Sequence, residues 1–328
     1  MLVACPHYTE PGRPCSNFAS LGKLPRLKVQ LHPTFQATNG LICVRIFLKL
    51  IPLSLVMAAA WGQNGTGTET EKSSQSSALV QTALANELKA AQDLSHPMRY
   101  SLRKSSPRLT TTKQLIETRD GSVAMLVSVD DKPLTSADSA KEQARLQLLL
   151  TDPGKQRHRK QSEAEDTARA LKVLRVLPKA FLYTDAGEVT EGSATLEKFT
   201  FVPSPRFNSP DLETQVLTQM AGEILVDPEH QRVVRLEAKL QQDVDFGWGI
   251  LGRLSKGGWI IIEQAEVGAG VWRVVKFQMK MTGRLLIRTR TFDTTEVTTQ
   301  FEPVPGDLGY QQAIAMLRAG QATVAGAR

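Results

Sequence analysis

The feature that most constrains the fold is an alternation of apolar and polar side chains that begins at Phe181 and continues to about residue 301. A period of two places successive side chains on opposite faces of a β-strand. Turn signals such as Asp227-Pro228-Glu229 and Thr282-Gly283 separate the alternating segments, which predicts an antiparallel series of strands. We expect strands near 180–184, 194–202, 220–227, 231–241, 257–266, 271–280 and 283–291, with a further one near 295–301.

Helical spacing is found mainly before this region, where apolar residues recur every three or four positions. That spacing is typical of amphipathic helices. A strand hairpin, 112–118 with 122–129, is predicted around the turn Asp120-Gly121. We expect helices over 79–94, from Ser136 or Ser139 to 150, over 155–177 (ending before Pro178), over 211–218 and over 309–319.

Strands in sequence, with helices set apart from them, define an α+β fold. We expect a large curved antiparallel sheet, an incomplete barrel, that is covered by helices. Residues 79–305 are predicted to form this single α+β half-barrel domain. Residues 306–328 are predicted to form a C-terminal helix and tail.

Residues 44–62 have the order of an export signal. Arg45 and Lys49 precede an apolar run over 50–57, and three alanines follow at 58–60. This order is typical of a secretory signal peptide, and the run is too short to be a good membrane-spanning helix. We therefore expect an exported protein, located in the periplasm or cell envelope or secreted.

Residues 1–43 differ from the signal that follows them, because they are Pro-rich and have no regular period. Two interpretations stay open: translation starts near Val44, or residues 1–43 are a disordered N-terminal extension. After the signal, residues 63–78 are rich in Gly, Ser, Thr and Glu. That composition predicts a flexible linker.

All the cysteines and most of the net positive charge lie at the start of the chain. Cys5, Cys15 and Cys43 all precede residue 60, so the remaining domain excludes a thiol nucleophile, a redox pair and thiolate-rich zinc sites. Residues 1–60 hold six basic residues and one acid, which leaves 34 basic and 32 acidic residues for the rest. The net charge of +7 therefore does not indicate a nucleic-acid-binding domain.

Two kinds of short pattern suggest ligand sites, but ordinary loops and turns explain them better. Residues 247–252 match GxGxxG, but the dinucleotide fingerprint needs a strand before it and a helix after it. Here we expect a glycine-rich loop between strands that packs Trp248 and Ile250 over the sheet. Asp227-Pro228-Glu229-His230 and 243–245 fit a turn and a strand end, and we expect no metal and no cofactor.

Catalytic and polyanion-binding patterns are also weak. The basic run over 155–160 is followed at once by acidic residues, which favours a solvated helix start over a binding patch. The sequence has no GxSxG elbow. Paired carboxylates that meet only in the folded chain leave an unrecognised hydrolase as a minor alternative.

Large apolar side chains gather on the predicted strands. They form either the core under the helices or, in a strongly curved sheet, the lining of a cavity for an apolar ligand. The candidate lining residues are Phe199, Phe201, Trp248, Trp259, Ile261, Trp272, Phe277 and Met279.

Several stretches of the second half resemble a group of secreted bacterial proteins. The order of strands, turns and helices over roughly 95–305 is also similar to that of the periplasmic lipoprotein-sorting carriers of the Lol type. That resemblance implies an incomplete antiparallel barrel, closed by helices, that holds acyl chains. The long helices predicted over 136–177 depart from the carrier pattern, and no carrier-specific contact residue can be carried over. The resembling stretches are 177–181, 199–205, 222–227, 246–252 and 256–258.

These observations predict an exported, non-enzymatic protein of the cell envelope that binds an acyl chain or another apolar ligand in a concave sheet. The alternative is a structural or protein-interaction module whose core is filled by its own side chains. We expect a lipid or other apolar ligand as partner, a peripheral membrane or envelope protein as a further partner, and no nucleic acid.

Overall fold

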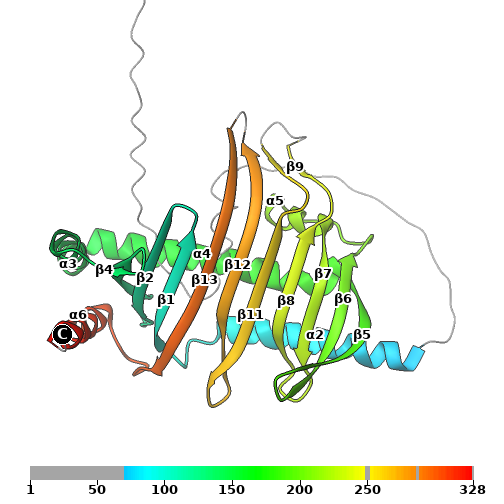
Figure 1. Cartoon of the computed structure of the whole chain (residues 1–328). Helices are drawn as coiled ribbons and strands as arrows, with labels where there is room; N and C mark the ends of the chain where they lie inside the picture. The colour runs from blue at the N-terminus through cyan, green and yellow to red at the C-terminus, as the bar shows by residue number, and fades with distance from the viewer. Residues whose placement is uncertain (1–69, 248–251, 286–287, 327–328) are drawn as a thin grey trace, which may run out of the picture. The chain divides into compact units, whose positions relative to one another are not determined.

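The computed structural model describes residues 70–247, 252–285 and 288–326 (Figure 1). The predicted signal peptide, the segment before it and the first part of the predicted linker lie outside these residues. The helices are α2 (Thr70–Gln92), α3 (Ser136–Thr151), α4 (Pro153–Ala180), α5 (Leu212–Gln215) and α6 (Tyr310–Gly326). The strands are β1 (Met98–Ser106), β2 (Leu109–Ile116), β3 (Val123–Val129), β4 (Lys132–Pro133), β5 (Phe181–Glu191), β6 (Ala194–Pro203), β7 (Met220–Asp227), β8 (Arg232–Leu240), β9 (Val244–Phe246), β10 (Gly252–Leu254), β11 (Trp259–Gly268), β12 (Val271–Leu285) and β13 (Arg288–Pro303).

The thirteen strands form one open antiparallel sheet, which confirms the predicted fold class. Their order is β4-β3-β2-β1-β13-β12-β11-β8-β7-β6-β5, and the short pair β9–β10 joins through β12. β4 and β5 occupy the two edges of this order and do not pair with each other. The C-terminal strand β13 therefore lies at the centre of the sheet, between β1 and β12.

Helices α2 and α4 pack on one face, which we call the covered face; the opposite one is the outer face (Figure 1). The core on the covered face joins Ala83 of α2 and Leu177 of α4 to Phe199 and Phe277 of the sheet. Helices α3 and α6 instead pack at the β2–β3 edge, around Ile116.

Strand register shows that α6 lies against the outer face. Ile116 is opposite Val123, whereas Leu115 is opposite Ala124 and Tyr100. Neighbouring residues of a strand point to opposite faces, so the clusters around Ile116 and around Leu115 lie on opposite sides of the sheet. The Leu115 cluster is on the covered face, because register connects it through β1 and β13 to Phe277.

The beginnings of α3 and α4 follow from local capping. The Thr135 side chain accepts a hydrogen bond from the Asp138 amide (3.1 Å), so the cap lies just before the predicted Ser136 or Ser139. Asp152 accepts from the amides of Gly154 and Lys155 (2.9 and 3.2 Å), and Pro153 occupies the first position of α4, where it needs no donor.

Two helix boundaries differ from the prediction. α2 begins at Thr70, within the segment predicted as a flexible linker. α4 continues through Pro178 to Ala180, since a proline in the last turn costs only one hydrogen bond near the helix end. Gln81 of α2 donates to the Pro178 carbonyl (3.3 Å), which ties the two helices together at this point.

The strand prediction was wrong at three places. β12 passes straight through Thr282-Gly283, which was expected to be a turn. Gly283 lies inside the strand, where a Cβ would be in tight contact with the Leu254 side chain (3.3 Å). The strands predicted at 283–291 and 295–301 are instead the end of β12 and a single β13. β1 was not predicted, and β9 and β10 flank the glycine-rich segment as a short antiparallel pair.

The outer face is largely a lattice of exposed and half-buried ion pairs. Register places Lys276 and Glu263 there, with Nζ–Oε1 at 3.0 Å. Lys280 and Asp293 form a second pair at 3.4 Å across β12 and β13. This charged lattice makes the covered face the place where an apolar ligand could be sheltered.

Candidate functional site

Four candidate lining residues come together on the covered face. Phe199, Phe201, Phe277 and Met279 are each at most 3% exposed and belong to one cluster with side chains of α2 and α4. They come from β6 and β12, which lie four places apart in the sheet. The apolar surface between them is continued by β7, β8 and β11.

Two other candidates lie on the opposite face. Trp259 is paired in register with Lys280, and Ile261 with Gln278. It is Ile260 and Ile262 that face Met279 and Phe277. The placement of Trp259 and Ile261 with Phe277 was therefore wrong, because four consecutive apolar residues, 259–262, conceal which alternate pair is buried.

The remaining two candidates are Trp272, which is not part of the covered-face cluster, and Trp248. Trp272 lies at the start of β12, where its ring centroid is 5.6 Å from that of His230. The Arg232 guanidinium is 5.5 Å from the same Trp272 ring. Trp248 lies outside the described residues.

α2 covers the β5–β8 end of the sheet with a narrow apolar stripe. Val80, Ala83 and Leu84 are its fully buried apolar side chains among the residues described, at the i, i+3, i+4 spacing that one helix face presents. Two of the three are short or branched close to the backbone. The helix therefore lies on the large side chains of the sheet without filling the space between strands itself.

One buried ion pair fixes α2 to β8. Glu87 accepts from Arg232 Nε and Nη2 (2.8 and 2.9 Å) and from the Val233 amide (3.0 Å). Asn86 donates to the Gln231 carbonyl (3.1 Å). These contacts hold the second half of α2, so its covering position depends on a few polar bonds and a small apolar stripe.

The β1–β3 half of the covered face combines a buried apolar cluster around Leu115 with buried and half-buried charged side chains. Lys104 of β1 and Glu296 of β13 form an ion pair at 2.6 Å, and the Glu296 side chain is 5% exposed. Burial lowers the pKa of neighbouring Lys113 to about 8; the positive charge of Arg145 adds to this, while Glu142 opposes it. The β1–β3 end thus places charged side chains beside its apolar cluster, whereas the cluster at the β6–β8 end consists of aromatic and aliphatic groups.

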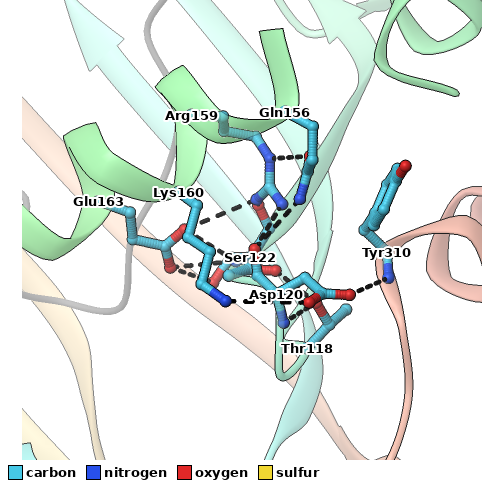
Figure 2. A network of polar contacts seen from close by, with 9 residues as sticks. Thr118, Asp120, Ser122, Gln156, Arg159, Lys160, Glu163 and Tyr310 are labelled. Carbon is cyan, nitrogen blue, oxygen red and sulfur yellow. Dashed lines mark hydrogen bonds and ion pairs between the residues drawn. The ribbon is translucent and has the colours of Figure 1, made fainter. Parts of the chain in front are cut away.

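The first half of α4 is bound to the β2–β3 turn by a buried arginine (Figure 2). Arg159 is 2% exposed and donates through Nη1 to the Ser122 carbonyl and through Nη2 to the Asp120 carbonyl (2.9 Å). Its Nε donates to Gln156 Oε1 (3.0 Å). Arg159 is therefore a structural clamp with all three nitrogens bonded.

Glu163, one turn further along α4, completes this network (Figure 2). Its carboxylate accepts from the Ser122 amide (2.9 and 3.0 Å) and hydroxyl (2.9 Å). Burial raises the pKa of Glu163, and the bonds from Ser122 and the charge of Arg159 oppose that shift. Lys160 is 3.9 Å from Asp120, whose carboxylate also accepts from the Tyr310 amide of α6 (3.4 Å).

Side chains of α3 continue the same pattern along β3. Arg145 Nη2 donates to the Ala124 carbonyl (2.5 Å), and Glu142 accepts from the Leu126 amide (2.8 Å). Together with Arg159 and Glu163, they satisfy the outward-pointing backbone groups at 122, 124 and 126. This edge of the sheet is thus closed by side chains instead of being left open to another strand.

The sequence prediction missed Arg159 and Glu163. The basic run 155–160 was interpreted as a solvated helix start, and Lys155 and Arg157 are indeed exposed. Arg159 is turned inward because it lies three residues after Gln156, which is also buried. The i, i+4 spacing of Arg159 and Glu163 was the available signal.

The two carboxylate patterns considered as metal sites are engaged otherwise. Asp227 accepts from the Glu229 and His230 amides and lies 2.8 Å from His230 Nδ1, as in a capped turn. Asp245 is paired with Arg253. Within the residues that the structure describes, no three His, Cys, Asp or Glu side chains come together as a metal-binding group.

The glycine-rich segment does not have the frame of a dinucleotide site. Gly252 at its end pairs with Phe246 at its start, so the segment connects two antiparallel strands and leads into no helix.

Across the described part of the chain, no helix is both long and apolar enough to span a membrane.

No family model matches the sequence, and no curated protein matches it either. Among solved structures, an outer membrane lipoprotein-sorting protein domain from Vibrio parahaemolyticus matches 72% of this chain and 97% of its own, with 12% identity and a TM-score of 0.26. A LolA superfamily protein from Nitrosomonas europaea matches 73% and 96%, with 7% identity and a TM-score of 0.27.

A DUF1329 family protein from Desulfovibrio piger matches 73% of this chain and 96% of its own, with 10% identity and a TM-score of 0.27. Two of these matches are named as lipoprotein-sorting or LolA superfamily proteins, the class that the sequence resembles. At these identities and TM-scores, no ligand, partner or site residue carries over from those proteins, and the functional argument depends on the geometry of this chain.

Proposed function

We propose that the protein is an exported binding protein that shelters an acyl chain or another apolar ligand between α2 and the apolar half of the covered face. The observation that carries this proposal is the continuous apolar surface of β6, β7, β8, β11 and β12. It belongs to an open sheet and is covered at one end by a helix with a narrow apolar stripe.

The mechanism is desolvation. A ligand chain would take the place of Val80, Ala83 and Leu84 against the sheet, and each 100 Å² of apolar surface removed from water contributes about 2.5 kcal/mol. The ordering cost is limited because the β1–β3 half is held by directional bonds that need not change. No acid, base or cofactor is required for this function.

Export is the second part of the proposal and depends on the signal-like order of residues 44–62. A carrier of this kind works where apolar molecules cross an aqueous space. We therefore place the protein in the periplasm or cell envelope.

A second candidate function is a protein-interaction module without a ligand. It is favoured by the burial of Phe199, Phe277 and Met279 under side chains of the same chain. In that case α2 would remain in place, and the outer face with its ion pairs would be the contact surface.

The experiment uses two neighbouring isoleucines on opposite faces of β11. Ile262 is packed against the covered-face cluster, and Ile261 is on the outer face. We expect Ile262→Ser to weaken binding of a fluorescent fatty acid about tenfold, because it removes apolar contact worth about 1.4 kcal/mol. The matched variant Ile261→Ser should bind as the wild type does.

Saturable binding by the wild type and the Ile261 variant, with loss in the Ile262 variant, supports the carrier. An absence of saturable binding by the folded wild type contradicts it and favours the interaction module. Equal weakening by both variants would also contradict the assignment to the covered face.

A further inference from the structure

The end of the β12–β13 hairpin carries three arginines without an acidic partner. Arg284, Arg288 and Arg290 are exposed, and within the described residues none of them forms an ion pair. The residues opposite them across the hairpin carry no charge. No Asp or Glu occurs anywhere from residue 282 to 291.

Two cations close to the hairpin are neutralised. Arg253, which lies beside Arg284 in register, is held by Asp245 at 2.5 Å and by Asp243 at 3.4 Å. Lys280 is paired with Asp293. The nearby carboxylates are therefore already engaged, and the charge of the three arginines remains uncompensated.

Three turns at the opposite end of the sheet are acidic. The β5–β6, β7–β8 and β11–β12 turns lie there (Figure 1). Their residues 185–193, 227–231 and 266–270 include six Asp or Glu and no Lys or Arg. Such a separation of charge orients a protein that approaches a charged surface, with the β12–β13 end toward a negative one.

The end of the β12–β13 hairpin extends beyond the neighbouring strands, so this end can contact a surface. Pairing between β11 and β12 ends at Lys280, whereas β12 and β13 stay paired to Leu285 and Arg288. Both strands therefore extend beyond β11 and β8 (Figure 1). Register places Arg284 on the outer face and Arg290 on the other, so cations lie on both sides of the ribbon.

We propose that this hairpin end docks the protein onto an anionic phospholipid surface through Arg284, Arg288 and Arg290. Guanidinium groups bind phosphate through two parallel hydrogen bonds, and a ribbon with cations on both faces can meet many headgroups of a flat surface at once. A protein partner packed on one side of the hairpin would leave part of the charge unused. The inference does not depend on what the covered face binds.

The test is co-sedimentation of the protein, expressed as the full chain, with vesicles of phosphatidylglycerol and phosphatidylethanolamine. Each basic residue near such a surface contributes about 1 kcal/mol, so the triple variant Arg284→Gln, Arg288→Gln, Arg290→Gln should partition about 100-fold less. The triple Lys variant should retain most of the binding. Vesicles of phosphatidylcholine alone should bind wild type and Gln variant equally weakly.

A matched control removes three exposed charges from α4, through Lys155→Gln, Arg157→Gln and Arg175→Gln. All variants share the N-terminal region, so its contribution cancels in the comparison. Circular dichroism confirms that each variant is folded. The proposal predicts that only the hairpin variant loses binding.

Equal loss in both triple variants, or no loss in the hairpin variant, overturns the proposal. Binding abolished by millimolar glycerol phosphate would assign the arginines to a small phosphate ligand instead of a surface. Hairpin-dependent binding to a DNA oligonucleotide, without binding to vesicles, would assign them to nucleic acid. Each of these results is distinguishable from failure of fatty-acid binding.

Discussion

The two halves of the covered face each contain an apolar cluster and differ in the polar contacts that accompany it. Under α2 and the end of α4, the β6–β8 half packs aromatic and aliphatic groups such as Phe199 and Phe277. Under the start of α4, the β1–β3 half also holds buried Arg159 and Glu296, which are paired with half-buried Glu163 and Lys104. Burial alone therefore does not distinguish a site that can adapt from one that is fixed.

The two kinds of contact differ in whether they require a particular geometry. Apolar contact is non-directional, so one apolar group can be replaced by another of similar volume at small cost. A buried charge is stable only while its particular hydrogen bonds remain. We infer that the β1–β3 half is a rigid base for the sheet, while the β6–β8 half can exchange the side chains of α2 for a ligand.

The largest expected effect is at the rigid half. Arg159→Ala should lower the free energy of unfolding by about 4 kcal/mol, because it leaves the Ser122 carbonyl without its donor, weakens the bonding of the Asp120 carbonyl and removes the positive charge beside Glu163. Urea denaturation measures this. The conservative control Arg157→Ala, at an exposed position, should cost less than about 0.5 kcal/mol.

A loss no larger for Arg159→Ala than for the control would show that the network is not needed for stability. The β1–β3 half would then not be held in place by its polar contacts, as we infer here.

A somewhat smaller effect is expected at the apolar half. Met279→Ala should lower the free energy of unfolding by about 3 kcal/mol through lost contact and the cavity that remains. The cavity should in turn take up a small apolar molecule, which stabilises the variant by an amount that grows with the logarithm of its concentration. Thermal unfolding with and without benzene checks both parts; a variant as stable as the wild type contradicts the packing described.

The smallest of the three effects has the opposite sign and depends on pH. The pKa of Lys113 is lowered in the folded protein from 10.5 to about 8, so the unfolded chain binds this proton more tightly. The cost to folding is fully present below pH 8 and is lost as the pH rises toward 10.5. Lys113→Met should therefore raise the free energy of unfolding at pH 7 by about 2 kcal/mol.

The gain from Lys113→Met should narrow between pH 8 and 10, as the wild type loses its penalty. Chemical denaturation across that range, with Lys132→Met as an exposed control, measures the difference. A gain that is constant or widens with pH would contradict the burial of a charged lysine here.

Sequence periodicity predicted most of the sheet because alternation persists on strands with one buried face. The prediction failed where apolar and polar residues do not alternate. Residues 259–262 are four apolar residues in a row, and only the strand register shows that Ile260 and Ile262 face the core. It also failed at Thr282-Gly283, where a glycine that signals a turn instead admits Leu254 against the strand.

The polar half could not be predicted for a different reason. Arg159 and Ser122 are 37 residues apart, and Lys104 and Glu296 are 192 apart. Charged residues at exposed and buried positions look alike in sequence until the strand order is known. The central position of β13 is what brings Glu296 to Lys104, and no local signal specifies that order.

The most direct test of the central claim is hydrogen–deuterium exchange with and without a bound fatty acid. We predict that the ligand changes the protection of α2 amides over 78–92 and leaves the protection of amides at the start of α4, over 153–166, unchanged. Unchanged α2 protection in the presence of saturating ligand, or equal changes in both helices, would contradict the division of the covered face into an adaptable and a fixed half.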